Sequence, residues 1–98
     1  MDNIFLPNQR IIILQGLEKD AGRSLSNEML QRLLRSYGHN CGIAEVNRHI
    51  NWLEQRGYVK ANRLENSGLV IAEMLRPGID VATGFVRAEG IDPPLQED

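Results

Sequence analysis

The feature that most constrains this chain is a change of hydrophobic period at Gly57. Before it, apolar residues recur every three to four positions, as in amphipathic helices, in two segments separated by a short turn that contains Gly38 and Gly42. After it, two β-prone runs flank a four-residue turn that ends in Gly68, which is the pattern of a hairpin. The expected elements are therefore helices over 27–37 and 43–56, followed by strands over 58–64 and 69–75.

Further elements are expected on both sides of this unit. Pro7 suits the first turn of a helix that ends at Ala21-Gly22, and Ser24-Leu25 is a short strand that can pair with the hairpin. A last short helix is expected over 77–88. Two helices joined by a short Gly-containing turn describe a helix-turn-helix, and a hairpin directly after it is a wing. The sequence predicts an α+β, mainly α fold: a winged helix-turn-helix with a three-helix core, a β-hairpin wing and a short C-terminal helix.

Length and composition indicate one domain in a reducing compartment. The 98 residues suffice for a single domain, expected over 1–90, with an extended acidic tail over 91–98. Cys41 is the only cysteine, so no intrachain disulfide is possible. The longest apolar run, 11–14, is too short to cross a bilayer, and the N-terminus lacks the basic and apolar regions of a signal peptide. We expect a cytoplasmic protein without membrane contact.

Individual residues are expected to define the ends and the buried side of the two central helices. Ser26 is a natural N-cap for the first of them. Cys41, in the turn, is expected to be a small buried plug, and Trp52 is expected at the edge of the core or in a dimer interface. Three apolar residues of the second helix should point inward: Val46, Ile50 and Leu53.

Charge is distributed unevenly along the chain, although the formal net charge is only −2. Residues 27–63 contain six Lys and Arg residues against three Glu residues, whereas residues 64–98 contain two Arg residues against seven acidic ones. A basic middle segment of this kind can face phosphate groups.

The order and spacing of several short motifs resemble a known group of proteins. They resemble the winged-helix core of ArsR- and MarR-type bacterial regulators. The tail, Leu75–Gly84 with Gly90-Ile91 and Pro93, is similar to that of small ArsR-like proteins of Mu-like phages and prophages. The resemblance implies a phage or prophage DNA-binding protein that regulates transcription. The motifs in the core are Gly22–Leu25, Met29-Leu30, Tyr37–His39, Val46, Trp52–Glu54 and Gly57–Val59.

In a winged helix that binds duplex DNA, the second helix of the helix-turn-helix enters the major groove and the wing contacts the backbone. Arg suits guanine edges and Asn suits adenine edges. The expected base contacts are Asn47, Arg48 and Asn51, with His49 at the margin of the exposed face. The expected backbone contacts are Arg32, Arg35, Lys60, Asn62 and Arg63.

Apolar residues near both ends of the chain suggest a homodimer, which would suit a target with two half-sites. The alternative is that they cap the core of a single chain. An alternative function is a protein–protein interaction module of a phage or prophage that does not bind DNA. The candidate interface residues are Phe5, Leu6, Phe85, Val86 and Ile91.

No catalytic or cofactor-binding motif is present in the sequence. There is no Gly-rich phosphate loop and no Ser or Cys placed with a His and an acid. His39, Cys41 and His49 are too few to predict a metal site of the ArsR sensor kind. We therefore expect neither enzymatic activity nor a bound metal or cofactor.

Overall fold

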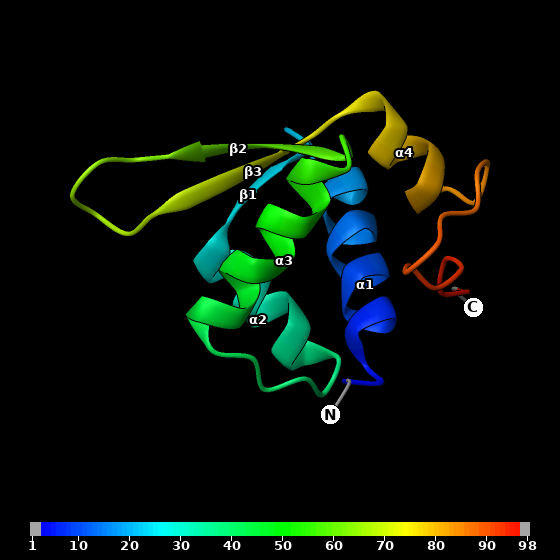
Figure 1. Cartoon of the computed structure of the whole chain (residues 1–98), viewed down its shortest axis with the longest axis horizontal. Coiled ribbons are helices and arrows are strands. Elements are labelled where there is room, and N and C mark those ends of the chain that lie inside the picture. The colour runs from blue at the N-terminus through cyan, green and yellow to red at the C-terminus, as the bar shows by residue number, and fades with distance from the viewer. Residues whose placement is uncertain (1–2, 97–98) are drawn as a thin grey trace.

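Four helices and a three-stranded antiparallel sheet make up residues 3–96, the part of the chain that the computed structural model describes (Figure 1). The fold is thus α+β and mainly helical, as the sequence predicts. The elements are α1 (Leu6–Lys19), β1 (Ser24–Ser26), α2 (Asn27–Ser36), α3 (Ile43–Gln55), β2 (Val59–Arg63), β3 (Val70–Met74) and α4 (Arg76–Ala82).

The sheet has the strand order β1-β3-β2, with both pairs antiparallel. Strands β2 and β3 form the expected hairpin, which projects away from the helices (Figure 1). The expected pairing of Ser24-Leu25 with the hairpin is confirmed, since Leu25 lies opposite Ala72 of β3. This third strand joins the base of the hairpin to the start of α2.

Local signals define α2 and α3 as expected. The Ser26 hydroxyl accepts a hydrogen bond from the Met29 amide (3.2 Å), so Ser26 is the N-cap of α2. Gly38 has a φ of +90°, the left-handed conformation that follows a helix end, and Gly42 is the N-cap of α3. Cys41 is buried in the turn between the two helices, which confirms its expected role.

The core lies where α1, α2 and α3 meet the inner face of the sheet. The inward face of α3 is as expected, because Val46, Ile50 and Leu53 are fully buried. Helix α1 contributes the largest share, and Ala72 and Val59 close the core from the sheet. The fully buried members from α1 and α2 are Ile11, Ile13, Leu14, Leu17, Leu30 and Leu34.

The C-terminal third differs from its prediction at the end of its helix. Helix α4 ends at Ala82 rather than near residue 88, because Gly84 adopts a φ of +82° and ends the helical backbone. The tail, predicted to be extended over 91–98, contains no helix or strand in its described part, residues 91–96, and this part packs on α1. Ile91 is only 7% exposed, the Asp92 amide donates to the Pro7 carbonyl (3.2 Å), and the Leu95 amide donates to Gln15 Oε1 (3.0 Å). Residues 97 and 98 of that tail lie outside the described residues.

Candidate functional site

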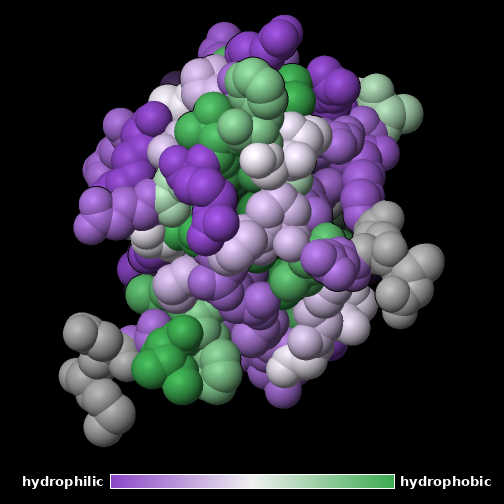
Figure 2. Space-filling model, turned by 90° about the vertical axis from the view of Figure 1, so that its right-hand side faces the viewer, coloured by the Kyte–Doolittle hydropathy of each residue, from purple (hydrophilic) through white to green (hydrophobic). Residues whose placement is uncertain are grey.

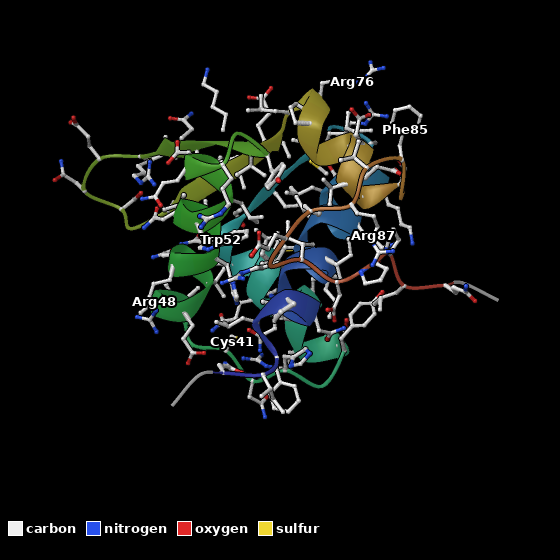
Figure 3. The ribbon with its side chains drawn as sticks, turned by 45° about the vertical axis from the view of Figure 1, so that its right-hand side comes forward. Cys41, Arg48, Trp52, Arg76, Phe85 and Arg87 are labelled. Atoms are coloured by element: carbon white, nitrogen blue, oxygen red, sulfur yellow. The ribbon has the colours of Figure 1, made fainter. Side chains whose placement is uncertain are left out.

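Helix α3 presents a polar stripe to the outside, opposite its buried apolar face. Arg48, Asn51 and Gln55 are exposed at helical spacing along this stripe. Arg48 points away from the body of the molecule (Figure 3). Among the described residues it has no ion-pair partner within 4 Å, so its guanidinium is available to a ligand.

A groove of about 310 Å³ separates this stripe from the hairpin. Glu54 fixes the hairpin against α3, because its Oε2 accepts from the Ala61 amide (3.1 Å) and its Oε1 pairs with the Arg63 guanidinium (3.0 Å). The hydrogen bond from Arg63 holds the pKa of Glu54 below its usual range. Arg63 also donates to Asn51 Oδ1. The groove is lined by Asn47, Asn51, Arg63, Leu64, Gly68, Leu69 and Val70.

Asn27, the first residue of α2, joins three elements beneath this groove. Its side chain is almost fully buried, and its Nδ2 donates to Asn47 Oδ1 (3.0 Å) and to the Gly68 carbonyl (3.1 Å). Its Oδ1 accepts from the amides of Glu28 (3.0 Å) and Val70 (3.4 Å). Sequence reasoning missed Asn27, since a polar residue after an N-cap carries no signal of such a role.

These internal hydrogen bonds determine which of the expected base-contact residues have free polar atoms. The amide oxygens of Asn47 and Asn51 both accept hydrogen bonds from within the protein. Bidentate pairing with adenine needs the amide oxygen as well as the amino group, so each Asn would have to exchange a partner first. Of the three candidates, Arg48 is the one whose polar atoms have no partner among the described residues.

The expected backbone contacts fall on separate surfaces. Arg32 and Arg35 are exposed on α2, and within the described chain neither has an acidic partner within 4 Å. Side chains alternate along a strand, and Arg63 lies on the α3 side of β2 together with buried Val59. Lys60 and Asn62 therefore occupy the opposite face of the hairpin, where Lys60 lies across from Glu73.

The prediction that His49 lies at the margin of the exposed face is wrong. Its side chain is 4% exposed, because α1 packs over this flank of α3. Its Nε2 donates to Gln9 Oε1 (2.7 Å), Gln9 Nε2 donates to His39 Nδ1 (3.3 Å), and His39 Nε2 donates to Asn8 Oδ1 (2.8 Å). Burial is the main cause that lowers the pKa of His49 to about 4, with Arg10 as the next cause.

The five expected dimer residues do not form one surface. Ile91 belongs to the core of its own chain, and Leu6 is half-buried beside α3. Phe5 directly precedes α1, whereas Phe85 and Val86 follow α4, which lies at the other end of α1 (Figure 1). Phe85 is 82% and Val86 45% exposed. On the face shown in Figure 2, apolar side chains form separate small patches among hydrophilic ones.

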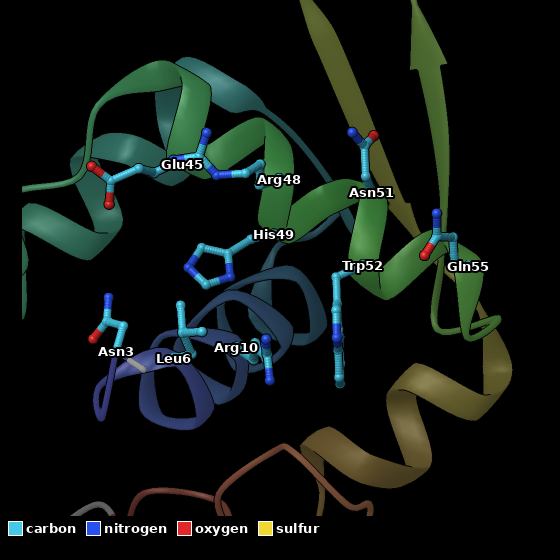
Figure 4. Close-up of a pocket in the computed structure, with 9 residues that line it drawn as sticks. All are labelled: Asn3, Leu6, Arg10, Glu45, Arg48, His49, Asn51, Trp52 and Gln55. Carbon is cyan, nitrogen blue, oxygen red and sulfur yellow. The ribbon is translucent and has the colours of Figure 1, made fainter. Parts of the chain in front are cut away.

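A second pocket, of about 480 Å³, lies between the N-terminal half of α1 and α3 (Figure 4). Trp52 forms one wall, and its indole ring is stacked between the guanidinium groups of Arg10 (3.8 Å) and Arg56 (3.6 Å). Trp52 packs against the edge of the core, one of the two positions expected for it. The lining residues are Asn3, Leu6, Arg10, Glu45, Arg48, His49, Asn51, Trp52 and Gln55.

Two classes of feature are absent from residues 3–96. No group of three or more His, Cys, Asp or Glu residues is placed to hold a metal ion. No helix in this part of the chain is both long and apolar enough to cross a membrane.

The fold and site define a class: a small, mainly helical α+β chain with a polar helix face beside a projecting hairpin. No known family matches the chain, and no solved structure matches it. The chain is similar to a protein of Haemophilus influenzae (strain ATCC 51907 / DSM 11121 / KW20 / Rd) that is described only as uncharacterized. The two are 30% identical over 63 residues, which span 64% of this chain and 61% of the relative.

Proposed function

We propose that this chain is a winged-helix protein that binds duplex DNA and regulates transcription, as in the phage and prophage proteins that its motifs resemble. The observation that carries the proposal is the exposed Arg48 on α3, which has no ion-pair partner within residues 3–96 and lies beside a hairpin that directly follows a helix–turn–helix arrangement. The short turn of residues 37–42 between α2 and α3, and the short β1 on the inner edge of the hairpin, agree with this class of fold.

In the proposed complex, α3 lies in the major groove and Arg48 contacts the edge of a guanine. Arg32 and Arg35 on α2 contact phosphates, since both are exposed. The hairpin contacts the backbone through Lys60 and Asn62, or through Arg63 after it exchanges its internal partners. Asn47 and Asn51 then serve mainly as amino-group donors, because their oxygens are engaged within the protein.

The test is a fluorescence-anisotropy titration of the folded protein with a pool of random-sequence duplexes and with phage operator fragments. Binding at about 50 mM salt should fall steeply at about 200 mM salt, because phosphate contacts release counterions. Arg48→Gln should weaken binding to a specific duplex by about 5–150-fold, which corresponds to the roughly 1–3 kcal/mol of one base contact.

Arg76→Gln is the matched control for this substitution. Arg76 is an exposed arginine on α4, and Figure 3 shows it at the opposite corner of the molecule from Arg48. It should leave duplex affinity unchanged. An equal loss of duplex affinity in the two variants would indicate non-specific charge attraction. It would contradict the assignment of α3 as the recognition helix.

A specific observation also favours the second candidate, a protein-interaction module that does not bind DNA. Phe85 is 82% exposed beside Val86, an apolar pair that a protein partner could cover. This candidate predicts no duplex binding at low salt. It also predicts partner binding that changes little with salt and is lost in Phe85→Ser.

A further inference from the structure

In the pocket between α1 and α3, each of the two helices contributes one cationic side chain and one apolar side chain to the lining. Leu6 and the edge of Trp52 contribute apolar surface, while Arg10 and Arg48 contribute positive charge (Figure 4). Glu45 is the only carboxylate among the nine lining residues. His49 is neutral near pH 7, because burial lowers its pKa to about 4. The lining therefore carries a net positive charge.

Arg10 is incompletely satisfied within the protein. Its Nη1 donates to the Gly90 carbonyl (2.9 Å), but its Nε is buried without a hydrogen-bond partner. Within residues 3–96, no carboxylate lies within 4 Å of its guanidinium. The Arg56 guanidinium also lies over the same indole ring, and burial, followed by this neighbouring cation, lowers the pKa of Arg10. A partly buried cation that lacks a counter-charge is costly, so an anion beside it would be stabilising.

We propose that this pocket binds a small organic anion that combines one carboxylate with an apolar ring or branched chain. The carboxylate pairs with Arg10 and Arg48, and the apolar part contacts Leu6 and the edge of Trp52. The volume of about 480 Å³ lies in the range of small-molecule sites, which combine apolar walls with a few polar groups. An inorganic anion would leave the apolar side chains of the lining uncovered.

If the proposed function holds, the pocket is also a regulatory site, because two of its lining residues, Arg48 and Asn51, belong to the proposed DNA-binding face. A carboxylate that engages Arg48 withdraws it from the duplex. By linkage, DNA then weakens the binding of the organic anion by the same factor. This consequence rests on the proposed function, whereas the ligand site itself does not.

The first test is made without DNA. The purified chain is titrated with benzoate, with benzyl alcohol and with inorganic phosphate, and the emission of Trp52 is followed because it is the only tryptophan. Benzoate should bind saturably with a Kd of about 1 mM or tighter, as expected for a ligand of this size in a preformed site. Benzyl alcohol and phosphate should bind at least about tenfold more weakly, because one lacks the charge and the other the apolar body.

Substitutions of the residues that line the pocket test whether the ligand binds there. Arg48→Gln should weaken benzoate binding several-fold, and Arg76→Gln, outside the pocket, should not change it. Arg10→Gln should abolish binding, although it also removes the contacts with Gly90 and Trp52. Glu45→Gln should tighten binding several-fold, because it removes the repelling carboxylate. A gain in affinity cannot arise from misfolding.

The outcomes separate the two proposals. No saturable benzoate binding, equal binding of phosphate, or benzoate binding that is insensitive to Glu45→Gln and Arg48→Gln would overturn the pocket proposal. Benzoate binding by a chain that binds no duplex would support the pocket and contradict the DNA-binding function. Duplex binding that weakens as benzoate is added, with the benzoate effect lost in Arg10→Gln, would support both.

Discussion

At the scale of single residues, a few buried polar side chains connect segments that lie far apart in the sequence. Asn27 connects α2 to the hairpin and to α3. Buried His49 and Gln9, together with half-buried His39, connect α3 to α1 and to the turn after α2. Each makes hydrogen bonds that offset the cost of burying its polar atoms. Removing one partner leaves another group unsatisfied, which costs about 1–3 kcal/mol.

The buried imidazole of His49 makes stability depend on pH. Its pKa in the folded chain is about 4, below the ordinary value of 6.5, so the unfolded chain binds the proton more tightly. The stabilisation is fully present above pH 6.5 and is lost as pH falls towards 4, by about 3 kcal/mol in all. Urea unfolding at several pH values should show this slope, and His49→Gln should flatten it. An NMR titration of the His49 ring with a midpoint near 6.5 would contradict the expectation.

At the scale of elements, the position of α4 depends on one backbone hydrogen bond and on a glycine that allows close packing. At the start of α4, the Leu75 amide donates a hydrogen bond to the carbonyl of Tyr58 (3.1 Å), a residue in the short connection between α3 and β2. Gly78 lies against the same carbonyl, and a Cβ at this position would come within 2.3 Å of the oxygen. The approach of α4 to the junction of α3 and β2 therefore requires glycine at position 78.

Gly78→Ala should lower the free energy of unfolding by about 1–3 kcal/mol, because backbone atoms rather than a flexible side chain must move. The matched control is Gly22→Ala, whose nearest neighbour to an added Cβ is the Asp20 carboxylate at 3.5 Å. The control should change stability by no more than about 1 kcal/mol. Thermal unfolding of the two variants measures the difference. A Gly78→Ala variant as stable as the control would contradict the close packing of α4.

At the scale of the whole molecule, two exposed regions lie on different sides: the polar face of α3 beside the hairpin, and the end of α4. Phe85 and Val86 are exposed just after the end of α4, and Figure 3 shows Phe85 on the side of the molecule opposite the hairpin. We propose that this pair forms the contact of a homodimer, since two-fold pairing is the commonest form of assembly. The α3 faces of both chains would then remain available to DNA.

Light scattering coupled to size-exclusion chromatography tests the dimer. The native chain should elute with the mass of two chains, and Phe85→Ser should shift it to one. Phe5→Ser is the matched control, because Phe5 is also exposed but lies at the opposite end of α1. A native monomer, or a dimer that is lost in Phe5→Ser and kept in Phe85→Ser, would contradict this assignment.

The order of elements follows from local features of the chain. The period of apolar residues distinguishes the helices from the strands, Ser26 and Gly38 set the two ends of α2, and the turn before Gly68 sets the hairpin. These signals can be found in the sequence because each depends on neighbours within a few positions. Helix α4 was predicted too long, since its apolar residues continue beyond Gly84 although the backbone turns there.

The candidate sites depend on contacts that no local pattern encodes. Helical spacing places His49 beside the buried face of α3, but only the packing of α1 decides that it is buried. The α1–α3 pocket likewise exists because Arg10 reaches the carbonyl of Gly90, 80 positions further along the chain, and stacks on Trp52. The sequence by itself determined the helices, the strands and the exposed Arg48, because periodicity and capping depend on interactions between residues only a few positions apart. The tertiary structure alone decided the pocket, the engaged oxygens of Asn47 and Asn51, and the packed tail, because these arise from the non-local burial of particular side chains.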